Sequence, residues 1–145
     1  MVDQQGVNVK ILVRDDGSTD GTLDILRKWE RNGKIEWYQG KHLNVQYGFY
    51  DLMEHSKEYD TNYYAFCDQD DVWDRDKLYV ALKALKEIGT GIPGLYYCGQ
   101  RLVDENLMFL SDHTLNENRN LKQDLYYLIS RDVQQFLIKH CYTKF

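Results

Sequence analysis

The sequence predicts an α/β fold in which helices flank a mostly parallel sheet, and three observations predict it. Short apolar runs alternate with longer segments whose apolar residues recur at helical spacing. The first run, residues 9–13 (VKILV), is almost continuously apolar, which is typical of a strand buried on both faces of a parallel sheet. Acidic loops follow two of the expected strands directly, at the edge where α/β proteins gather ligands.

The first helix is expected between the loop after this strand and residues 32–33. Its apolar side chains recur at helical spacing: Leu23, Leu26 and Trp29. Side chains of residues 18–20 can cap its first turn. The Asn-Gly pair at 32–33 tolerates the left-handed conformation in which many helices end. A second short strand is expected at residues 35–38.

A second helix is expected after the loop at residues 40–44, since four apolar residues share one of its faces: Val45, Phe49, Leu52 and Met53. The third strand, residues 63–67, runs straight into an acidic loop. Asp74 or Asp76 can cap the helix that follows. This third helix carries an apolar stripe: Leu78, Leu82, Leu85 and Ile88.

The last third of the chain predicts a strand, a hairpin and a terminal helix. Residues 89–94 contain the only proline and predict a loop. A strand at residues 95–98 precedes a hairpin over residues 102–110, whose turn is expected at Asp104–Asn106. Apolar residues between 121 and 139 recur at helical spacing and predict the terminal helix.

Composition and charge exclude some classes of protein. The chain has 145 residues, enough for one domain, and a formal net charge of -5, which argues against a nucleic-acid groove lined with Lys and Arg. The three cysteines lack the spacing of a metal site and predict free thiols in a reducing compartment. Apolar runs are too short for a membrane span. We therefore expect a cytoplasmic protein, with work at the inner face of the membrane left open.

The two acidic clusters are the candidate functional residues. Asp15 and Asp16 follow the first strand, and Asp68, Asp70 and Asp71 follow the third. Since parallel strands end at one edge of a sheet, the clusters can converge. Three carboxylates within four positions repel one another, and Mg²⁺ or Mn²⁺ would supply the missing counter-charge. The alternatives are an Asp-Gly turn for the first cluster and a solvated helix cap for the second.

Two segments together match a known pattern. VRDDGSTDGT (residues 13–22) and FCDQDDVW (residues 66–73) resemble the motifs of family 2 inverting glycosyltransferases, which have the GT-A fold. The resemblance is greatest to rhamnosyltransferase-like members that build bacterial surface polysaccharides, and LVDEN (residues 102–106) also resembles a segment of these proteins. It covers roughly residues 7–110 and implies a Rossmann-like, mostly parallel sheet flanked by helices.

The resemblance implies transfer of a sugar, with inversion, from a UDP- or dTDP-linked donor to a saccharide or lipid-linked acceptor. Asp16 would hydrogen-bond the nucleotide base, and Asp15 would support the loop that carries it. No nucleic acid is expected as a partner, and a homo-oligomer is left open.

The resemblance also implies roles for the second cluster. Asp68 and Asp70 would form the metal-binding DxD pair, in which Asp70 ligates the divalent cation and Asp68 faces the ribose or a metal-bound water. Asp71 and Trp73 would shape the donor pocket. The cation would neutralise the departing diphosphate.

The sequence departs from the family pattern at three places. The usual first strand is lacking, so we expect a single truncated domain over residues 1–145. Either the strands at 9–13 and 63–67 pair directly, or something else fills the gap between them, such as a partner chain. Residues 41–44 differ from the usual loop, and His42 is expected to be a partly exposed loop residue, with contact to a phosphate as the alternative. The third departure is at the carboxyl end, where nothing after Ser111 matches the acceptor-side region that normally supplies the catalytic base. Three carboxylates are available there, and none is assigned as the base: Asp112, Asp124 and Asp132.

Two other classes of function stay open at this point. The chain could be a non-catalytic remnant that binds nucleotide or metal, or an interaction module. A phosphoacceptor receiver domain also places acids after two strands. It would need a Ser or Thr and then a Lys after two later strands, and residues 95–98 and 102–110 do not end in that pattern.

Overall fold

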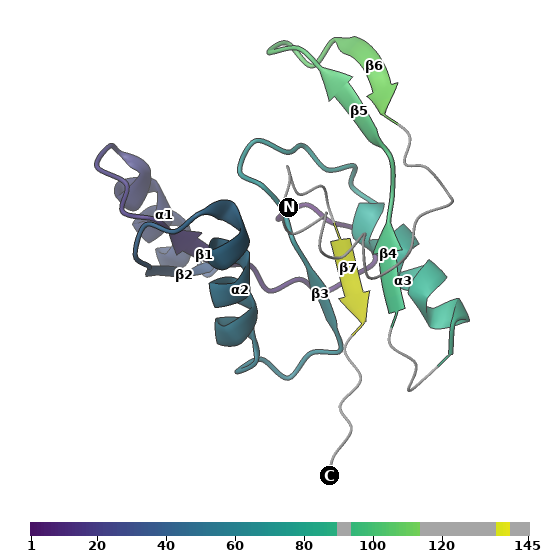
Figure 1. The fold of residues 1–145 in the computed structure, drawn as a ribbon, viewed down its shortest axis with the longest axis horizontal. Helices are drawn as coiled ribbons and strands as arrows, with labels where there is room; N and C mark the ends of the chain where they lie inside the picture. The colour runs from purple at the N-terminus through teal and green to yellow at the C-terminus, as the bar shows by residue number, and fades with distance from the viewer. Residues whose placement is uncertain (90–93, 114–135, 140–145) are drawn as a thin grey trace. The chain divides into compact units, whose positions relative to one another are not determined.

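The computed structural model describes residues 1–89, 94–113 and 136–139 (Figure 1). The chain is α/β, as expected. Its elements in order are β1 (Leu12–Asp15), α1 (Thr22–Arg31), β2 (Glu36–Gln39), α2 (Val45–Ser56), β3 (Tyr63–Ala65), α3 (Lys77–Glu87), β4 (Gly94–Tyr97), β5 (Gln100–Val103), β6 (Phe109–His113) and β7 (Phe136–Lys139).

The elements form two compact units. The first unit comprises Met1–Thr61 and Val72–Tyr79, and the second comprises Asn62–Asp71 and the described residues from Val80 onward. The first turn of α3 therefore belongs to the first unit and the rest of α3 to the second. Each unit carries one of the two acidic loops.

In the first unit, β1 and β2 form a parallel pair in which Leu12 lies opposite Glu36 and Asp15 lies opposite Gln39. Helix α1 makes the crossover between the two strands, and α2 packs against β1. The ladder begins at Leu12, three residues later than expected, because β2 starts opposite that residue. The apolar residues of β1 are half-buried rather than buried on both faces, and β2 is its only strand partner among the described residues.

The two helices of the first unit begin and end close to the expected places. At the start of α1, Asp20 Oδ1 accepts a hydrogen bond from the Thr22 N–H at 2.9 Å. Gly33, just beyond its end, has φ +64°, the left-handed conformation expected of the Asn-Gly pair. Asn44 is the N-cap of α2, and its side-chain oxygen accepts from the Tyr47 N–H at 3.0 Å.

Helix α3 receives a cap from the amino-terminal segment. The Leu78 N–H donates to Gln4 Oε1 at 2.9 Å, and the Gln4 amide donates in turn to the Asp74 carbonyl at 2.7 Å. This partner lies more than seventy residues away in the chain, so no local pattern could have predicted it. The buried face of α3 is formed by Leu78, Ala81 and Leu85, whereas Ile88 at the end of the expected stripe is 43% exposed.

In the second unit, β7 lies between β3 and β4 and is antiparallel to both (Figure 1). The terminal helix expected through residue 139 is therefore wrong for Phe136–Lys139, and residues 121–135 lie outside the described residues. Phe-Leu-Ile is a continuous apolar run that suits either a helix or a strand. The paired edges of β3 and β4 decide in favour of the strand.

The hairpin expected over residues 102–110 is present as β5 and β6, with a bulge between Leu102 and Val103. The Asp104 side chain holds its turn by accepting from the Asn106 and Met108 N–H groups, both at 2.9 Å. Leu107 in this turn has φ 61°. Most of the expected loop at 89–94 lies outside the described residues.

The described ladders comprise one parallel pair and three antiparallel pairs, so the parallel part of this α/β fold is small. Direct pairing between the first strand and the strand at 63–67 was one expectation, and it is wrong for the described residues: β1 pairs with β2, and β3 pairs with β7. The other expectation, that something else fills the gap, stays a prediction.

Candidate functional site

The Asp15 side chain accepts hydrogen bonds from the loop that follows β1. Its side chain is buried, with a relative exposure of 4%, and its Oδ2 accepts from the Gly17 N–H at 2.9 Å, the Ser18 N–H at 3.1 Å and Gln39 Nε2 at 3.2 Å. The pKa of Asp15 lies below its ordinary value, chiefly because the Ser18 side chain hydrogen-bonds it; the loop N–H groups add to this effect against the opposing effect of burial. Gly17 has φ +94°, which lets the loop turn tightly enough for these bonds. The carboxylate thus holds the loop in shape.

Arg14 is a functional candidate that the sequence reasoning missed. Its side chain is only 3% exposed although it stands in a half-buried strand. Its Nε donates to Asp51 Oδ2 at 2.7 Å, its Nη2 donates to the Lys41 carbonyl at 2.6 Å, and its Nη1 forms an ion pair with Asp16 Oδ1. A cationic residue inside an apolar run, directly before two acids, was the available signal.

Asp51, Tyr38 and His55 support this arginine from the other side. The Tyr38 hydroxyl donates to Asp51 Oδ2 at 2.8 Å, and the Tyr38 and His55 rings stack with centroids 4.1 Å apart. Hydrogen bonds from Arg14, first, and from Tyr38 hold the pKa of Asp51 below its ordinary value. Burial, and then the Asp51 carboxylate, raise the pKa of Tyr38. Residues from β1, β2 and α2 are thereby joined in one polar network.

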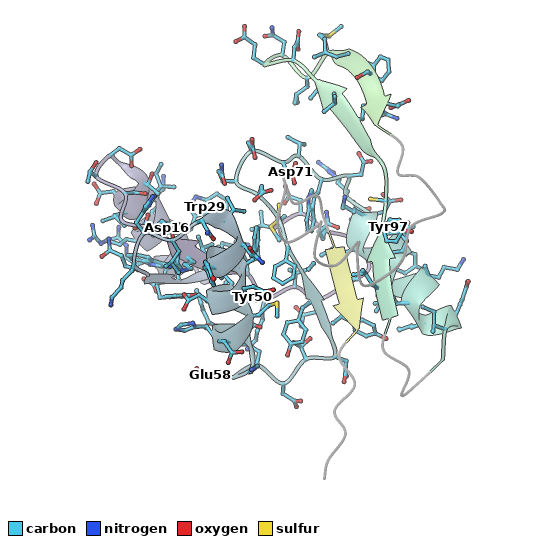
Figure 2. All side chains as sticks on the ribbon, in the orientation of Figure 1. Asp16, Trp29, Tyr50, Glu58, Asp71 and Tyr97 are labelled. Atoms are coloured by element: carbon cyan, nitrogen blue, oxygen red, sulfur yellow. The ribbon has the colours of Figure 1, made fainter. Side chains whose placement is uncertain are left out.

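Asp16 is the exposed member of the pair. One of its oxygens is held by Arg14, and 42% of its side chain remains exposed. Figure 2 labels the residue. Asp15 and Asp16 therefore differ: the Asp15 carboxylate accepts hydrogen bonds from its own loop, whereas the Asp16 carboxylate faces solvent. A carboxylate held at a fixed place with an exposed oxygen can accept a hydrogen bond from a ligand N–H.

The second acidic cluster follows β3. Asp68 is half-buried, Asp70 is exposed, and the Asp71 N–H donates to the Asp68 carbonyl at 3.4 Å. Asp71 is labelled in Figure 2. Its Oδ2 atom is buried and has no hydrogen-bond partner in the described structure. A buried carboxylate oxygen in that state is costly unless a ligand, a water or an ion completes it.

Trp73 is the other member of this segment with an unsatisfied group. Its side chain is 9% exposed, its Nε1 is buried without a partner in the described structure, and Lys77 Nζ lies 5.1 Å from the ring centroid. An indole N–H of this kind can donate to an oxygen of a bound molecule.

The residues expected to bind metal supply oxygen ligands of the type that Mg²⁺ and Mn²⁺ prefer. Among the described residues, no three His, Cys, Asp or Glu side chains are grouped so that they alone could hold an ion. The acidic pair after β1 belongs to the first unit and Asp68, Asp70 and Asp71 to the second, so their convergence stays a prediction.

The remaining candidates have ordinary surroundings. His42 lies in the loop after β2 and is exposed, rather than partly exposed as expected; its contact with a phosphate stays a prediction. Asp112 is an exposed residue of β6 whose Oδ1 lies 3.7 Å from Arg101 Nε, whereas Asp124 and Asp132 lie outside the described residues. Within the described ranges, none of the helices is both long enough and apolar enough to span a membrane.

Comparison with known proteins places the chain in a family. The model of the family described as glycosyl transferase family 2 matches residues 1–141. The chain is 29% identical over 93 residues to the dTDP-rhamnosyl transferase RfbG of Shigella flexneri, a match that covers 59% of this chain and 31% of that protein. The match thus spans about a third of the curated relative, and no solved structure matches. The chain belongs to glycosyltransferase family 2, with likeness to a rhamnosyl transferase.

Proposed function

We propose that this chain carries the donor-binding loops of a glycosyltransferase that moves a sugar from a nucleoside diphosphate to a saccharide or lipid-linked acceptor in polysaccharide synthesis. The observation that carries the proposal is the loop after β1, where Asp15 is buried and fully engaged while Asp16 is held by Arg14 and exposed. The likeness to a dTDP-rhamnosyl transferase supports a UDP- or dTDP-linked donor.

Asp16 recognises the nucleotide base in this proposal. Uracil and thymine both carry an imide N–H, which is a hydrogen-bond donor, and a carboxylate is an acceptor only. A charge-assisted bond of this kind is stronger than a neutral one. The rigidity of the loop supports the role, because an acceptor that is already in place loses little conformational entropy when the base binds.

The second acidic loop handles the diphosphate. Asp68 and Asp70 would hold Mg²⁺ or Mn²⁺, and the cation would supply positive charge to offset the negative charge that develops on the leaving diphosphate. Asp71 and Trp73 line the donor pocket. Their unsatisfied oxygen and indole N–H support this role, because a donor hydroxyl and a phosphate or ribose oxygen would complete them.

Transfer with inversion needs a base that takes a proton from the acceptor hydroxyl. No residue is assigned to that step. The site of action proposed is the cytoplasm, with the inner face of the membrane as the place where a lipid-linked acceptor would be met.

Calorimetric titration of UDP and dTDP, with and without Mn²⁺, tests the proposal. We expect Mn²⁺-dependent binding that Asp70→Ala abolishes and that Asp16→Ala weakens about tenfold or more, the loss expected for one charge-assisted hydrogen bond. Asp24→Ala is the matched control, since Asp24 is an exposed residue of α1 whose partner is Arg27 on the surface. Failure of both nucleotides to bind the folded chain would overturn the proposal. Release of dTDP from a dTDP-sugar would separate a working enzyme from a non-catalytic binding module.

A further inference from the structure

Arg14 uses its whole guanidinium group. The three nitrogens face three different parts of the first unit: α2 through Asp51, the loop after β2 through the Lys41 carbonyl, and the loop after β1 through Asp16. The fork of donors is planar and rigid, so fixing two of these partners also fixes where the third must lie. Only Asp16 among the three is an exposed loop side chain.

The surroundings hold the guanidinium in place. A Cβ built on Gly40 would lie 2.5 Å from Arg14 Cζ, so the absence of a side chain there makes room for the group. Gly40 is not among the glycines with positive φ, so its backbone does not by itself require glycine. Asp51 is braced in turn by the Tyr38 hydroxyl.

We propose that Arg14 is a positioning residue for nucleotide recognition, which orients the Asp16 carboxylate and couples it to the loop after β2 and to α2. The inference rests on the proposed role of Asp16. Without the guanidinium, Asp16 is a solvent-facing side chain that must be ordered when the base binds. Ordering one such side chain costs roughly a twofold to tenfold loss of affinity.

The ion pair also competes with the ligand for Asp16, and the geometry decides which effect wins. A carboxylate offers about four lone-pair positions, and the base N–H needs one. Arg14 bonds to Oδ1, and 42% of the Asp16 side chain stays exposed. Positioning therefore outweighs competition.

Three variants of the full chain test the inference by titration of dTDP in the presence of Mn²⁺. Arg14→Lys keeps the charge and loses the fork, and we expect it to raise the Kd about tenfold. Gly40→Ala pushes on the guanidinium without altering Asp16 or Arg14 and should raise the Kd in the same direction. In an Asp16→Ala background, Arg14→Lys should change the Kd by less than about twofold, because the carboxylate through which Arg14 acts is then absent.

A destabilised control separates positioning from general damage. Leu26→Ala removes a buried side chain of α1, in the same unit, and should lower the melting temperature while leaving the Kd within about twofold of the unsubstituted chain. If Arg14→Lys does not fold, Gly40→Ala alone and in the Asp16→Ala background carries the same comparison.

The outcomes are distinguishable. Equal loss of affinity from Arg14→Lys with and without Asp16 would overturn the inference, since Arg14 would then not act through Asp16. If Asp16→Ala weakens binding while Arg14→Lys and Gly40→Ala do not, the inference falls and the proposed function stands. If the unsubstituted chain binds no nucleotide, or Asp16→Ala binds normally, the proposed role of Asp16 falls and the inference falls with it.

Discussion

Asp15 and Asp16 are neighbours with the same side chain, and their surroundings give them different roles. Asp15 is the last residue of β1, and Asp16 is the first residue of the loop that follows it. Asp15 turns into its own loop and meets two backbone N–H groups, whereas Asp16 lies beside Arg14 and solvent. The division follows from which donors each carboxylate meets. A buried acid that already accepts hydrogen bonds from Gly17, Ser18 and Gln39 has little left to offer a ligand.

Replacement of Asp15 should therefore damage the loop itself. In Asp15→Asn, an amide must present its oxygen to the loop N–H groups and loses the charge that strengthens those bonds. We expect the free energy of unfolding, measured by urea denaturation at pH 7, to fall by about 1–3 kcal/mol. Asp24→Asn, on the exposed face of α1, should change it by less than about 0.5 kcal/mol. Equal effects at the two positions would show that Asp15 does not hold the loop.

At the scale of elements, helix ends are where local sequence and long-range structure meet. Helix α2 begins with a local cap, since Asn44 accepts from the Tyr47 N–H three residues on. Helix α3 receives a cap from Gln4, at the far end of the chain. Both satisfy a backbone N–H that the helix cannot satisfy by itself. Only the first can be found by inspection of neighbouring residues.

The cap of α2 can be tested directly. Asn44→Ala removes the acceptor for the Tyr47 N–H and should lower the free energy of unfolding by about 1 kcal/mol. Asn44→Ser retains a capping oxygen and should stay close to the unsubstituted chain. Urea denaturation at pH 7, with the helix signal in circular dichroism as the probe, measures both. The cap would be of no consequence if alanine and serine gave the same midpoint.

At the scale of the whole molecule, the chain is acidic, with a net charge of -5. Hydrogen-bond donors keep three of its carboxylates ionised. The pKa values of Asp15, Asp20 and Asp51 all lie below the ordinary 3.8, each because hydrogen bonds favour the charged form. A pKa that is lower in the folded state than in the unfolded state adds stability above the unfolded pKa. That stability is lost as pH falls through the folded value.

Stability should consequently hold steady at neutral pH and decline as pH drops below about 4. The free energy of unfolding from urea titrations between pH 7 and pH 2 measures this decline. Asp51→Asn removes one of the three contributing carboxylates, so its acid decline should be shallower, although it is less stable at pH 7 through the loss of its charged contact with Arg14. Parallel curves for the two proteins would show that Asp51 does not contribute to the acid decline.

Much of the architecture could be predicted because its causes are local. Apolar spacing located the three helices found among the described residues, and short apolar runs located the first four strands within a few residues. The Asn-Gly pair, the turn at Asp104 and the acidic loops were each recognisable from a few consecutive residues, because turns and helix ends depend on local hydrogen bonds and backbone conformation. The family resemblance rested on two such segments, and the family match over residues 1–141 confirms it.

Tertiary structure alone decided the rest, because these features depend on residues that are distant in the chain. The partners of Arg14, the cap that Gln4 supplies to α3 and the pairing of Phe136–Lys139 with β3 and β4 each join distant segments. Residues 136–139 carry a pattern that fits a helix or a strand, and only the neighbouring strands choose between them. The residues next to Arg14 in the sequence do not explain why an arginine stands inside an apolar run. Its reason is the two carboxylates and the carbonyl that the fold brings to its guanidinium.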